Sequence, residues 1–216
     1  MLLDLHTHST ASDDSRATVE QYVKWGDVIR KKGGNIDGFV LTEHRQFDHN
    51  LDYSRLSSES GLLILKGAEL DTDSGHFLVY GITSDITNRL DFSNVNLRAV
   101  DLVYTCDEYG AIAIPAHPGR TGIGFAEFIK DGVAEFQSIR TVELLNGSNR
   151  PGEGERAKQL VEKYGFRGTG GSDAHIVSSI GTCMTKFANA ITNEEDLVKE
   201  LRSLKFEAVT AADTSN

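Results

Sequence analysis

The sequence predicts a single α/β domain in which strands and helices alternate. Short apolar segments with strand character are separated by amphipathic segments with helical periodicity, the order that builds parallel βαβ units. The length of 216 residues suits one domain with its own hydrophobic core. No fixed-period repeat, low-complexity tract or Pro- or Ser-rich linker divides the chain, so residues 1–216 are expected to form one domain.

Nine segments rich in apolar and β-branched residues are expected to form strands. They are Met1–Leu5, Gly38–Thr42, Leu62–Leu70, His76–Ile82, Ala111–Pro115, Arg140–Leu145, Arg167–Gly170, Gly181–Phe187 and Phe206–Thr210. Four amphipathic segments are expected to form helices, namely Thr18–Lys31, Asn96–Tyr109, Glu153–Tyr164 and Asn193–Leu204. In the last of these, an N-capping Asn193 followed by two glutamates favours a helix N-terminus.

Both an open doubly wound sheet and a closed barrel agree with this order of elements. The G-x-G-x-x-G fingerprint of dinucleotide-binding sheets does not follow an early strand of the sequence. The turn sequence Thr72-Asp73-Ser74-Gly75 lies between the third and fourth predicted strands, which indicates a local hairpin rather than a crossover. We therefore expect an irregular barrel.

The composition excludes several classes of protein. Apolar runs such as Leu62–Leu65 are far shorter than the roughly 20 residues that span a bilayer, and no signal-peptide pattern opens the sequence, so no membrane partner is expected. Cys106 and Cys183 form no CxxC pair, which favours a reducing compartment, the cytoplasm. The net charge of −10 argues against long duplex nucleic acid, but not against a small anionic substrate beside bound cations.

Five predicted strands end in histidine or carboxylate residues, at the edge where α/β barrels build active sites. These residues are His6, His8 and Asp13 on the first, then His44, Glu69 and His117, and finally Asp173 with His175. Imidazole and carboxylate suit Zn, Mn or Fe, and an H-x-H pair in a strand points both rings to one face. Because one ion needs fewer donors than this, we expect two to three divalent metal ions.

Each residue taken alone also has an ordinary structural interpretation. An isolated H-x-H pair is a weak signal, Glu69 could be a surface carboxylate, and Asp173 could cap a helix. Ligand-type residues at five separate strand ends are poorly explained by solvated loops. The combination therefore favours a metal site.

The ordered motifs DLHTHSTASDD, LTEH, GAEL, AHP and GSDAH resemble the PHP (polymerase and histidinol phosphatase) domain of metal-dependent phosphoesterases, from Asp4 to about Phe187. The resemblance implies a distorted seven-stranded (β/α) barrel with a trinuclear metal cleft. It assigns as ligands His6, His8, Asp13, His44, Glu69, His117, Asp173 and His175, and His76 before the strand as a ninth. Two motifs depart from the family pattern, because Asp14 replaces a usual Gly and Glu43 replaces a usual Asp.

The resemblance also implies hydrolysis of a small phosphate ester, either a phosphomonoester or a nucleotide, by water whose pKa the ions lower. Arg120 is expected to clamp the phosphate with its planar guanidinium group, and Arg45 is a second candidate. Asp173 is assigned to the catalytic centre, and His175 or a metal-bound water is expected to protonate the leaving oxygen. Arg150 is a further candidate at the mouth of the cleft.

Two other functions remain open at this point, and so does the oligomeric state. An amidohydrolase-type metallohydrolase usually carries a carboxylated lysine at a strand end, whereas Lys66 lies inside a predicted strand. A non-catalytic PHP module with a protein partner would have lost metal ligands, and no expected ligand is missing here.

Overall fold

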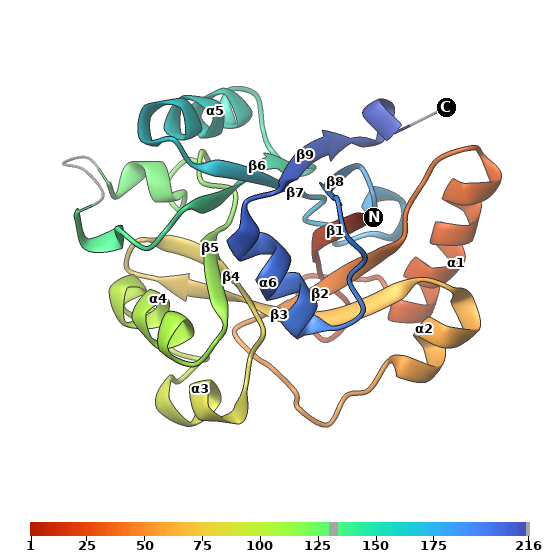
Figure 1. The fold of residues 1–216 in the computed structure, drawn as a ribbon, viewed down its shortest axis with the longest axis horizontal. Helices are drawn as coiled ribbons and strands as arrows, with labels where there is room; N and C mark the ends of the chain where they lie inside the picture. Colours follow the sequence, from red (N-terminus) through yellow and green to blue (C-terminus); the bar gives the residue numbers. More distant parts are fainter. Residues whose placement is uncertain (130–133, 215–216) are drawn as a thin grey trace.

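A strongly curled seven-stranded sheet forms the centre of the computed structural model, which describes residues 1–129 and 134–214 (Figure 1). The strand order is β5-β4-β3-β2-β1-β8-β9. These strands are β1 (Leu2–Thr7), β2 (Gly38–His44), β3 (Leu63–Thr72), β4 (Gly75–Tyr80), β5 (Ile112–Pro115), β8 (Cys183–Phe187) and β9 (Phe206–Thr210). A two-stranded sheet of β6 (Thr141–Asn146) and β7 (Arg167–Gly171) contacts β5 on one side and β1, β8 and β9 on the other. The predicted distorted barrel is therefore confirmed, with part of its wall closed by packing rather than by a continuous ladder.

The strand directions divide the barrel into two parts. β1, β2 and β3 run parallel, and so do β6 and β7. The pairs β3–β4, β4–β5, β1–β8 and β8–β9 are antiparallel. The predicted hairpin is present between β3 and β4, where Thr72 pairs with Gly75 and Gly75 adopts a φ of 101° that favours glycine.

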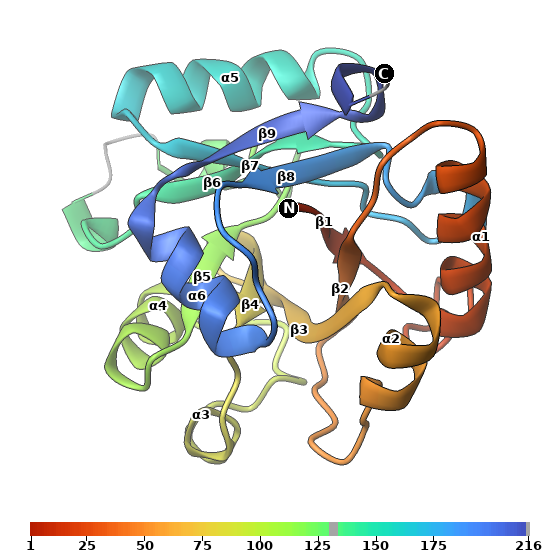
Figure 2. The same ribbon diagram turned by 45° about the vertical axis from the view of Figure 1, so that its right-hand side comes forward.

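Most of the helices lie on the outer side of the barrel, whereas the last one, α6 (Glu194–Ser203), lies across one end of it (Figures 1 and 2). Leu197 and Leu201 of α6 pack there with inward-facing strand residues such as Leu3. The other helices are α1 (Val19–Lys31), α2 (Ser54–Ser60), α3 (Ser84–Arg89), α4 (Ala99–Glu108) and α5 (Glu153–Tyr164), with short 3₁₀ turns at Phe125–Glu127, Ala134–Phe136, Val177–Ser179 and Ala211–Thr214. The sequence does not predict α2 and α3, because α2 buries no side chain and α3 buries only Ile86, so neither has an apolar stripe. None of the helices in the described ranges has the length and apolarity to cross a membrane.

Two buried tyrosines tie the surrounding backbone to the end of the barrel that carries the predicted ligands. The Tyr22 hydroxyl of α1 lies 2.8 Å from the His8 carbonyl oxygen and 2.7 Å from that of Ala174, so it links the segments after β1 and β7. The Tyr80 hydroxyl donates to the carbonyl of Leu5 at 2.8 Å. Both phenol rings are fully buried, so these contacts are shielded from water.

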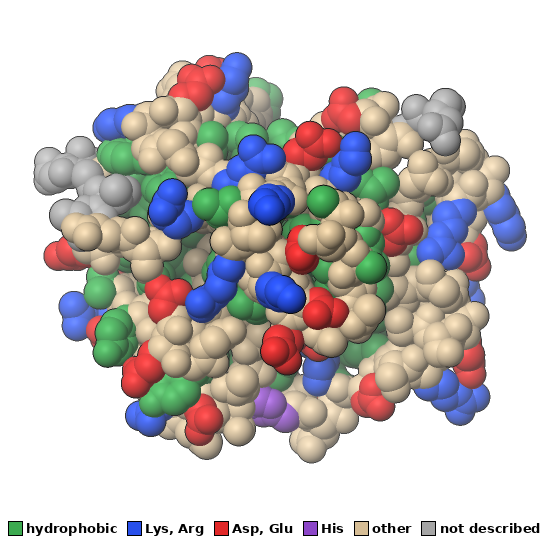
Figure 3. All heavy atoms as spheres, viewed as in Figure 1, with side chains coloured by type: hydrophobic (Ala, Val, Ile, Leu, Met, Phe, Trp, Pro, Cys, Tyr) green, Lys and Arg blue, Asp and Glu red, His purple; other side chains and the backbone are tan. Residues whose placement is uncertain are grey.

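Three of the seven histidine side chains are buried. On the face shown in Figure 3, acidic, basic and apolar side chains are interspersed, and histidine appears only at the lower edge. His6, His8 and His117 are at most 1% exposed. Imidazole is seldom buried without a polar partner, so these rings need polar groups or a bound ion inside the barrel.

Gly38 at the start of β2 tests the tight packing between parallel strands. A Cβ atom at this position would lie 2.2 Å from the Leu63 carbonyl oxygen, so Gly38→Ala is expected to destabilise the fold by about 1–3 kcal/mol. In Gly154→Ala, in contrast, the new Cβ would come no closer than 3.8 Å to Asn149, and helix propensity predicts a gain of about 0.5–1 kcal/mol. Urea unfolding of both variants measures the difference, and equal midpoints would contradict the described packing.

Candidate metal centre

Imidazole and carboxylate groups from six strands meet at one end of the barrel. His6 lies on β1, His44 ends β2, Glu69 lies on β3, His76 opens the antiparallel β4, His117 follows β5, and His8, Asp173 and His175 follow β1 and β7. The His8 ring stacks against two others, with its centroid 4.2 Å from that of His44 and 4.3 Å from that of His175, and these two rings lie 5.7 Å from each other. The structure thus brings together every predicted ligand except Asp13.

Glu69 is the centre of this arrangement, and its side chain is 1% exposed. Five histidines have a ring nitrogen within 3.3 Å of its carboxylate: His6, His8 and His44 at 3.2, 3.3 and 3.2 Å from Oε2, and His76 and His117 at 3.1 and 2.8 Å from Oε1. Each oxygen therefore faces a different set of imidazoles. A carboxylate placed in this way is suited to bridge two metal ions.

The buried charges in the centre shift one another's pKa values. Burial alone would raise the pKa of Glu69, but His6 and the hydrogen bonds from neighbouring imidazoles lower that pKa well below its ordinary value. Burial would likewise raise the pKa of Asp173, but His6 and His8 lower it strongly. For His6, burial would lower the pKa, whereas Glu143, Asp173 and Glu69 raise it well above the ordinary value. The carboxylates are thus held ionised, and a proton on His6 compensates them when no cation does.

The donor atoms fit divalent metal ions. They form three groups in which all donors lie within 4.8 Å of one another: His8, His44 and His175; His6, His8, Glu69 and Asp173; and Glu69, His76 and His117. The Nε2 atoms of His44 and His175 face each other at 3.4 Å, and His8 Nε2 and His44 Nδ1 lie 3.3 and 3.2 Å from Glu69 Oε2 without hydrogen-bond geometry. Imidazole nitrogens that face one another, next to ionised carboxylates, are the donor chemistry that zinc, manganese and iron take.

Asp14, rather than Asp13, is the aspartate of the first motif that reaches the centre. Its Oδ2 atom lies 3.3 Å from Nε2 of His44 and 3.2 Å from Nε2 of His175. Asp13 is exposed and makes no ion pair with the histidines of the described chain. The motif resemblance assigned Asp13 as the ligand and Asp14 to the position of a usual Gly, but the direction of each side chain depends on the turn at residues 12–15.

Glu43 has a supporting position instead of a place in the cluster. Its carboxylate accepts hydrogen bonds from the backbone of Ser9 at 3.0 Å and from the Ser12 hydroxyl at 2.6 Å. The Ser12 hydroxyl in turn accepts from the backbone N–H of His44 at 3.1 Å. The extra methylene of Glu43 therefore lets β2 hold the loop that carries Asp14.

The two predicted phosphate-binding arginines lie in different settings. Arg120 Nη2 donates to Asp173 Oδ2 at 2.7 Å and to Asn146 Oδ1 at 3.3 Å, at the border of a cavity of about 420 Å³ that Arg150 and His175 also line. Arg45 is instead paired with Asp71 at 3.2 Å, on the side of His76. Arg120 is therefore adjacent to the candidate ligand Asp173, whereas Arg45 forms its ion pair with Asp71, which is outside the three donor groups.

Sequence reasoning missed Glu143 and Asn146, which lie inside the centre. Glu143 Oε1 is 2.9 Å from His6 Nδ1, and its Oε2 accepts from the Asn146 side chain at 3.0 Å. Residues three apart in a regular strand face opposite sides, but β6 carries one extra residue between Glu143 and Leu145 relative to β7. That bulge turns both polar side chains inward. The sequence signal for it was a charged residue within the apolar segment T-V-E-L-L-N.

The backbone is strained at three positions next to the cluster. Arg45, His117 and Asp173 have φ values of 53°, 29° and 52°, in the region that favours glycine. Such conformations persist when the surroundings over-determine them, and they concentrate at functional sites.

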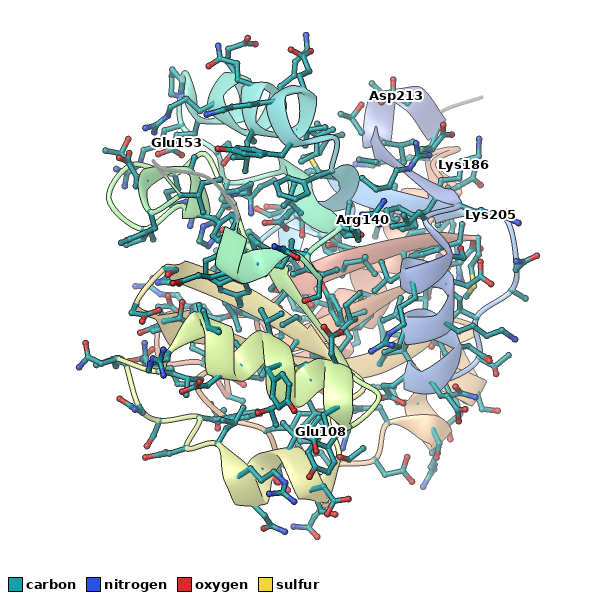
Figure 4. The ribbon with its side chains drawn as sticks, turned by 60° about the vertical axis from the view of Figure 1, so that its left-hand side comes forward. Glu108, Arg140, Glu153, Lys186, Lys205 and Asp213 are labelled. Atoms are coloured by element: carbon teal, nitrogen blue, oxygen red, sulfur yellow. The ribbon has the colours of Figure 1, made fainter. Side chains whose placement is uncertain are left out.

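Comparison with known proteins agrees with this geometry. A family model described as PHP-associated matches residues 151–206. The uncharacterized protein MJ0417 of Methanocaldococcus jannaschii is 30% identical over 203 residues, covering 91% of this chain and 74% of its own. A two-domain protein from Bacteroides vulgatus that contains a predicted PHP-like metal-dependent phosphoesterase has a TM-score of 0.64, at 18% identity, over 97% of this chain and 64% of its own. The chain belongs to the PHP family. Its distorted barrel is the PHP fold, and the α5–α6 region that the family model matches includes Glu153, which lies beside the loop after β5 (Figure 4).

A second structural relative of this PHP chain corrects the expectation about nucleic acid. Endonuclease Q, solved with a 27-mer duplex substrate that has an abasic lesion at the active site, has a TM-score of 0.66, at 14% identity, over 96% of this chain and 58% of its own. Exclusion of duplex nucleic acid on the basis of net charge is therefore wrong. A net charge averages the whole surface, whereas ions and arginines set the potential of a local site.

We expect Asp14→Asn to weaken metal binding and Asp13→Asn to leave it unchanged. The first substitution keeps the size of the side chain but removes the anionic oxygen that faces His44 and His175. Metal content after dialysis against limiting zinc, measured by atomic emission, compares the two variants. If Asp13→Asn loses metal and Asp14→Asn does not, Asp13 is the ligand and the assignment of Asp14 is wrong.

Metal binding to the centre is expected to strengthen as pH rises from about 6 to about 7.5. The raised pKa of His6 means that the metal-free site holds a proton in this range, and an ion must displace it. One displaced proton corresponds to about a tenfold decrease in the apparent dissociation constant per pH unit. Chelator competition at several pH values measures this slope, and a constant affinity would contradict a protonated His6.

Proposed function

We propose that this PHP chain hydrolyses a phosphate ester in a site that holds two to three divalent metal ions. The observation that carries the proposal is the set of three linked donor groups, with the guanidinium group of Arg120 at their border. The group with His6 and Asp173 shares His8 with one of the other two and Glu69 with the other. Zinc, manganese and iron are the ions that this donor chemistry favours. We also propose that residues 1–216 act as a single domain in the cytoplasm, where the free thiols of Cys106 and Cys183 would stay reduced.

The proposed chemistry assigns a role to each part of the centre. Bound ions would supply a water of lowered pKa and neutralise charge on the phosphoryl oxygens. Glu69, Asp173 and the imidazoles would hold those ions at the end of the barrel. Arg120 borders the cavity and has further N–H donors for a phosphate oxygen, since Asp173 and Asn146 engage one nitrogen of its guanidinium group.

His175 is the proposed ligand that faces the cavity and would hold an ion through Nε2, so the proton for the leaving oxygen would come from a bound water. The His175 ring is 28% exposed and lines the cavity beside Arg120, whereas His6 and His8 are buried. Its Nδ1 atom lies 3.0 Å from the carbonyl oxygen of Asp173, which fixes the orientation of the ring. The substrate class we favour is a small phosphomonoester or nucleotide, because the cavity has a volume of only about 420 Å³.

We expect His8→Ala and Asp173→Asn to abolish phosphate release from the metal-loaded protein. Each change removes a donor from the group formed with His6 and Glu69. Phosphate release is measured from phosphomonoesters, diesters and oligonucleotide duplexes, with amide substrates as a comparison for amidohydrolase chemistry. His49→Ala is the matched control, since its Nε2 is 3.0 Å from Thr87 Oγ1 on α3, outside the three groups.

Full activity of either ligand variant after chelation and metal return would overturn the site assignment. If the protein hydrolyses amides and releases no phosphate, the proposed phosphoesterase reaction is wrong and amidohydrolase chemistry replaces it. Bound metal with no activity on any ester, together with a stable partner in pull-downs, would favour a non-catalytic PHP module.

A further inference from the structure

We propose that Glu143 is a positioning residue that sets the tautomer and direction of the His6 imidazole, and that Asn146 extends this control to Asp173. The proposal rests on the proposed function, because it treats His6 and Asp173 as ligands of a metal ion. Glu143 itself lies outside the three donor groups. It contacts His6 and Asn146 through hydrogen bonds and would not contact an ion directly.

The Glu143 carboxylate is 1% exposed and is surrounded by donors. Its Oε2 atom accepts from the backbone N–H of His117 at 2.7 Å and from the Asn146 side-chain amide at 3.0 Å. Its Oε1 atom lies 2.9 Å from Nδ1 of His6. An ionised carboxylate only accepts hydrogen bonds, so the proton in this last contact belongs to His6 Nδ1.

A neutral imidazole carries one N–H, so a proton on Nδ1 leaves the lone pair on Nε2. His6 Nε2 lies 3.2 Å from Glu69 Oε2 and 3.5 Å from Asp173 Oδ1, within the group that also includes His8. Glu143 thus directs the metal-binding atom of His6 toward the centre. Carboxylates that orient a ligating histidine in this way raise its basicity and support metal affinity.

Asn146 connects the same carboxylate to a second candidate ligand. Its side-chain nitrogen lies 3.0 Å from Glu143 Oε2 and 3.3 Å from Asp173 Oδ2, and its oxygen accepts from Arg120 at 3.3 Å. The bulge in β6 allows both Glu143 and Asn146 to face inward. Gly171 on β7 leaves the space they need, since a Cβ there would lie 2.5 Å from His6 Cβ and 2.7 Å from Glu143 Oε1.

The test is zinc affinity of the full chain, measured by competition with a chromophoric chelator. Glu143→Gln keeps the size of the side chain but places an amide donor against one of the surrounding N–H groups, and it is expected to weaken zinc binding about 10- to 100-fold. Glu200→Gln is the matched control, because Glu200 is also a buried glutamate but is bonded to Asn189, outside the donor groups. Its zinc affinity is expected to equal that of the wild type.

A spectroscopic measurement separates positioning from general stability. In the zinc-loaded wild type, the His6 Nδ1–H proton is expected to give a protected, downfield nitrogen-bound signal in NMR spectra, and Glu143→Gln is expected to lose it. If Glu143→Gln does not fold, Asn146→Ser serves in its place, with weakened zinc affinity and the signal retained but shifted. Unchanged zinc affinity in the folded variant, or a signal assigned to His6 Nε2–H, overturns the proposal.

These measurements also test separately the proposed hydrolysis of a phosphate ester and the proposed positioning role of Glu143. A wild-type chain that binds none of zinc, manganese and iron overturns both of them. A wild-type chain that binds zinc without hydrolysing any ester, and whose affinity falls in Glu143→Gln, overturns the proposed hydrolysis and supports the role of Glu143.

Discussion

Burial of the Glu69 carboxylate is the constraint on which the end of this barrel depends. An ionised carboxylate removed from water costs several kcal/mol unless positive charge and hydrogen bonds offset that cost. Here five imidazoles surround it, and they lie on or directly after β1, β2, β4 and β5 of the seven-stranded sheet. Protons on the histidines or divalent cations can supply the positive charge, so the same geometry that stabilises the fold also creates metal affinity.

The sequence predicts most of this architecture, because strand periodicity and ligand-type residues at strand ends are local signals. All nine predicted strands and the four predicted helices are present near their expected positions. Asp14 and the pair Glu143–Asn146 were not predicted, since their directions depend on a turn and on a bulge, and the charged Glu143 within an apolar segment is only a weak signal of the bulge. Side-chain direction at such irregularities follows from tertiary packing, which one sequence does not display.

Arg120 illustrates how one side chain can combine two demands. Its ion pair with Asp173 neutralises a carboxylate that is 3% exposed, while its own side chain is 23% exposed beside the cavity. A guanidinium group can serve both purposes because its five donors point in fixed directions. Substitution by lysine would keep the charge but not this geometry, so charge alone does not describe its contribution.

The bulge in β6 means that the length of this strand, as well as its residue types, determines the inner surface of the barrel. Because the ladder absorbs the extra residue Leu144 as a bulge, Glu143 and Asn146 face the same side although they are three positions apart, and deletion of Leu144 would leave them two apart and still on one side. A change of one residue at this bulge would thus preserve the inward-facing polar pair, whereas the same change elsewhere between them, without a bulge, would turn one of the two outward. Variation in strand length is in this respect a route by which a barrel of this kind can diversify the surroundings of one set of donors.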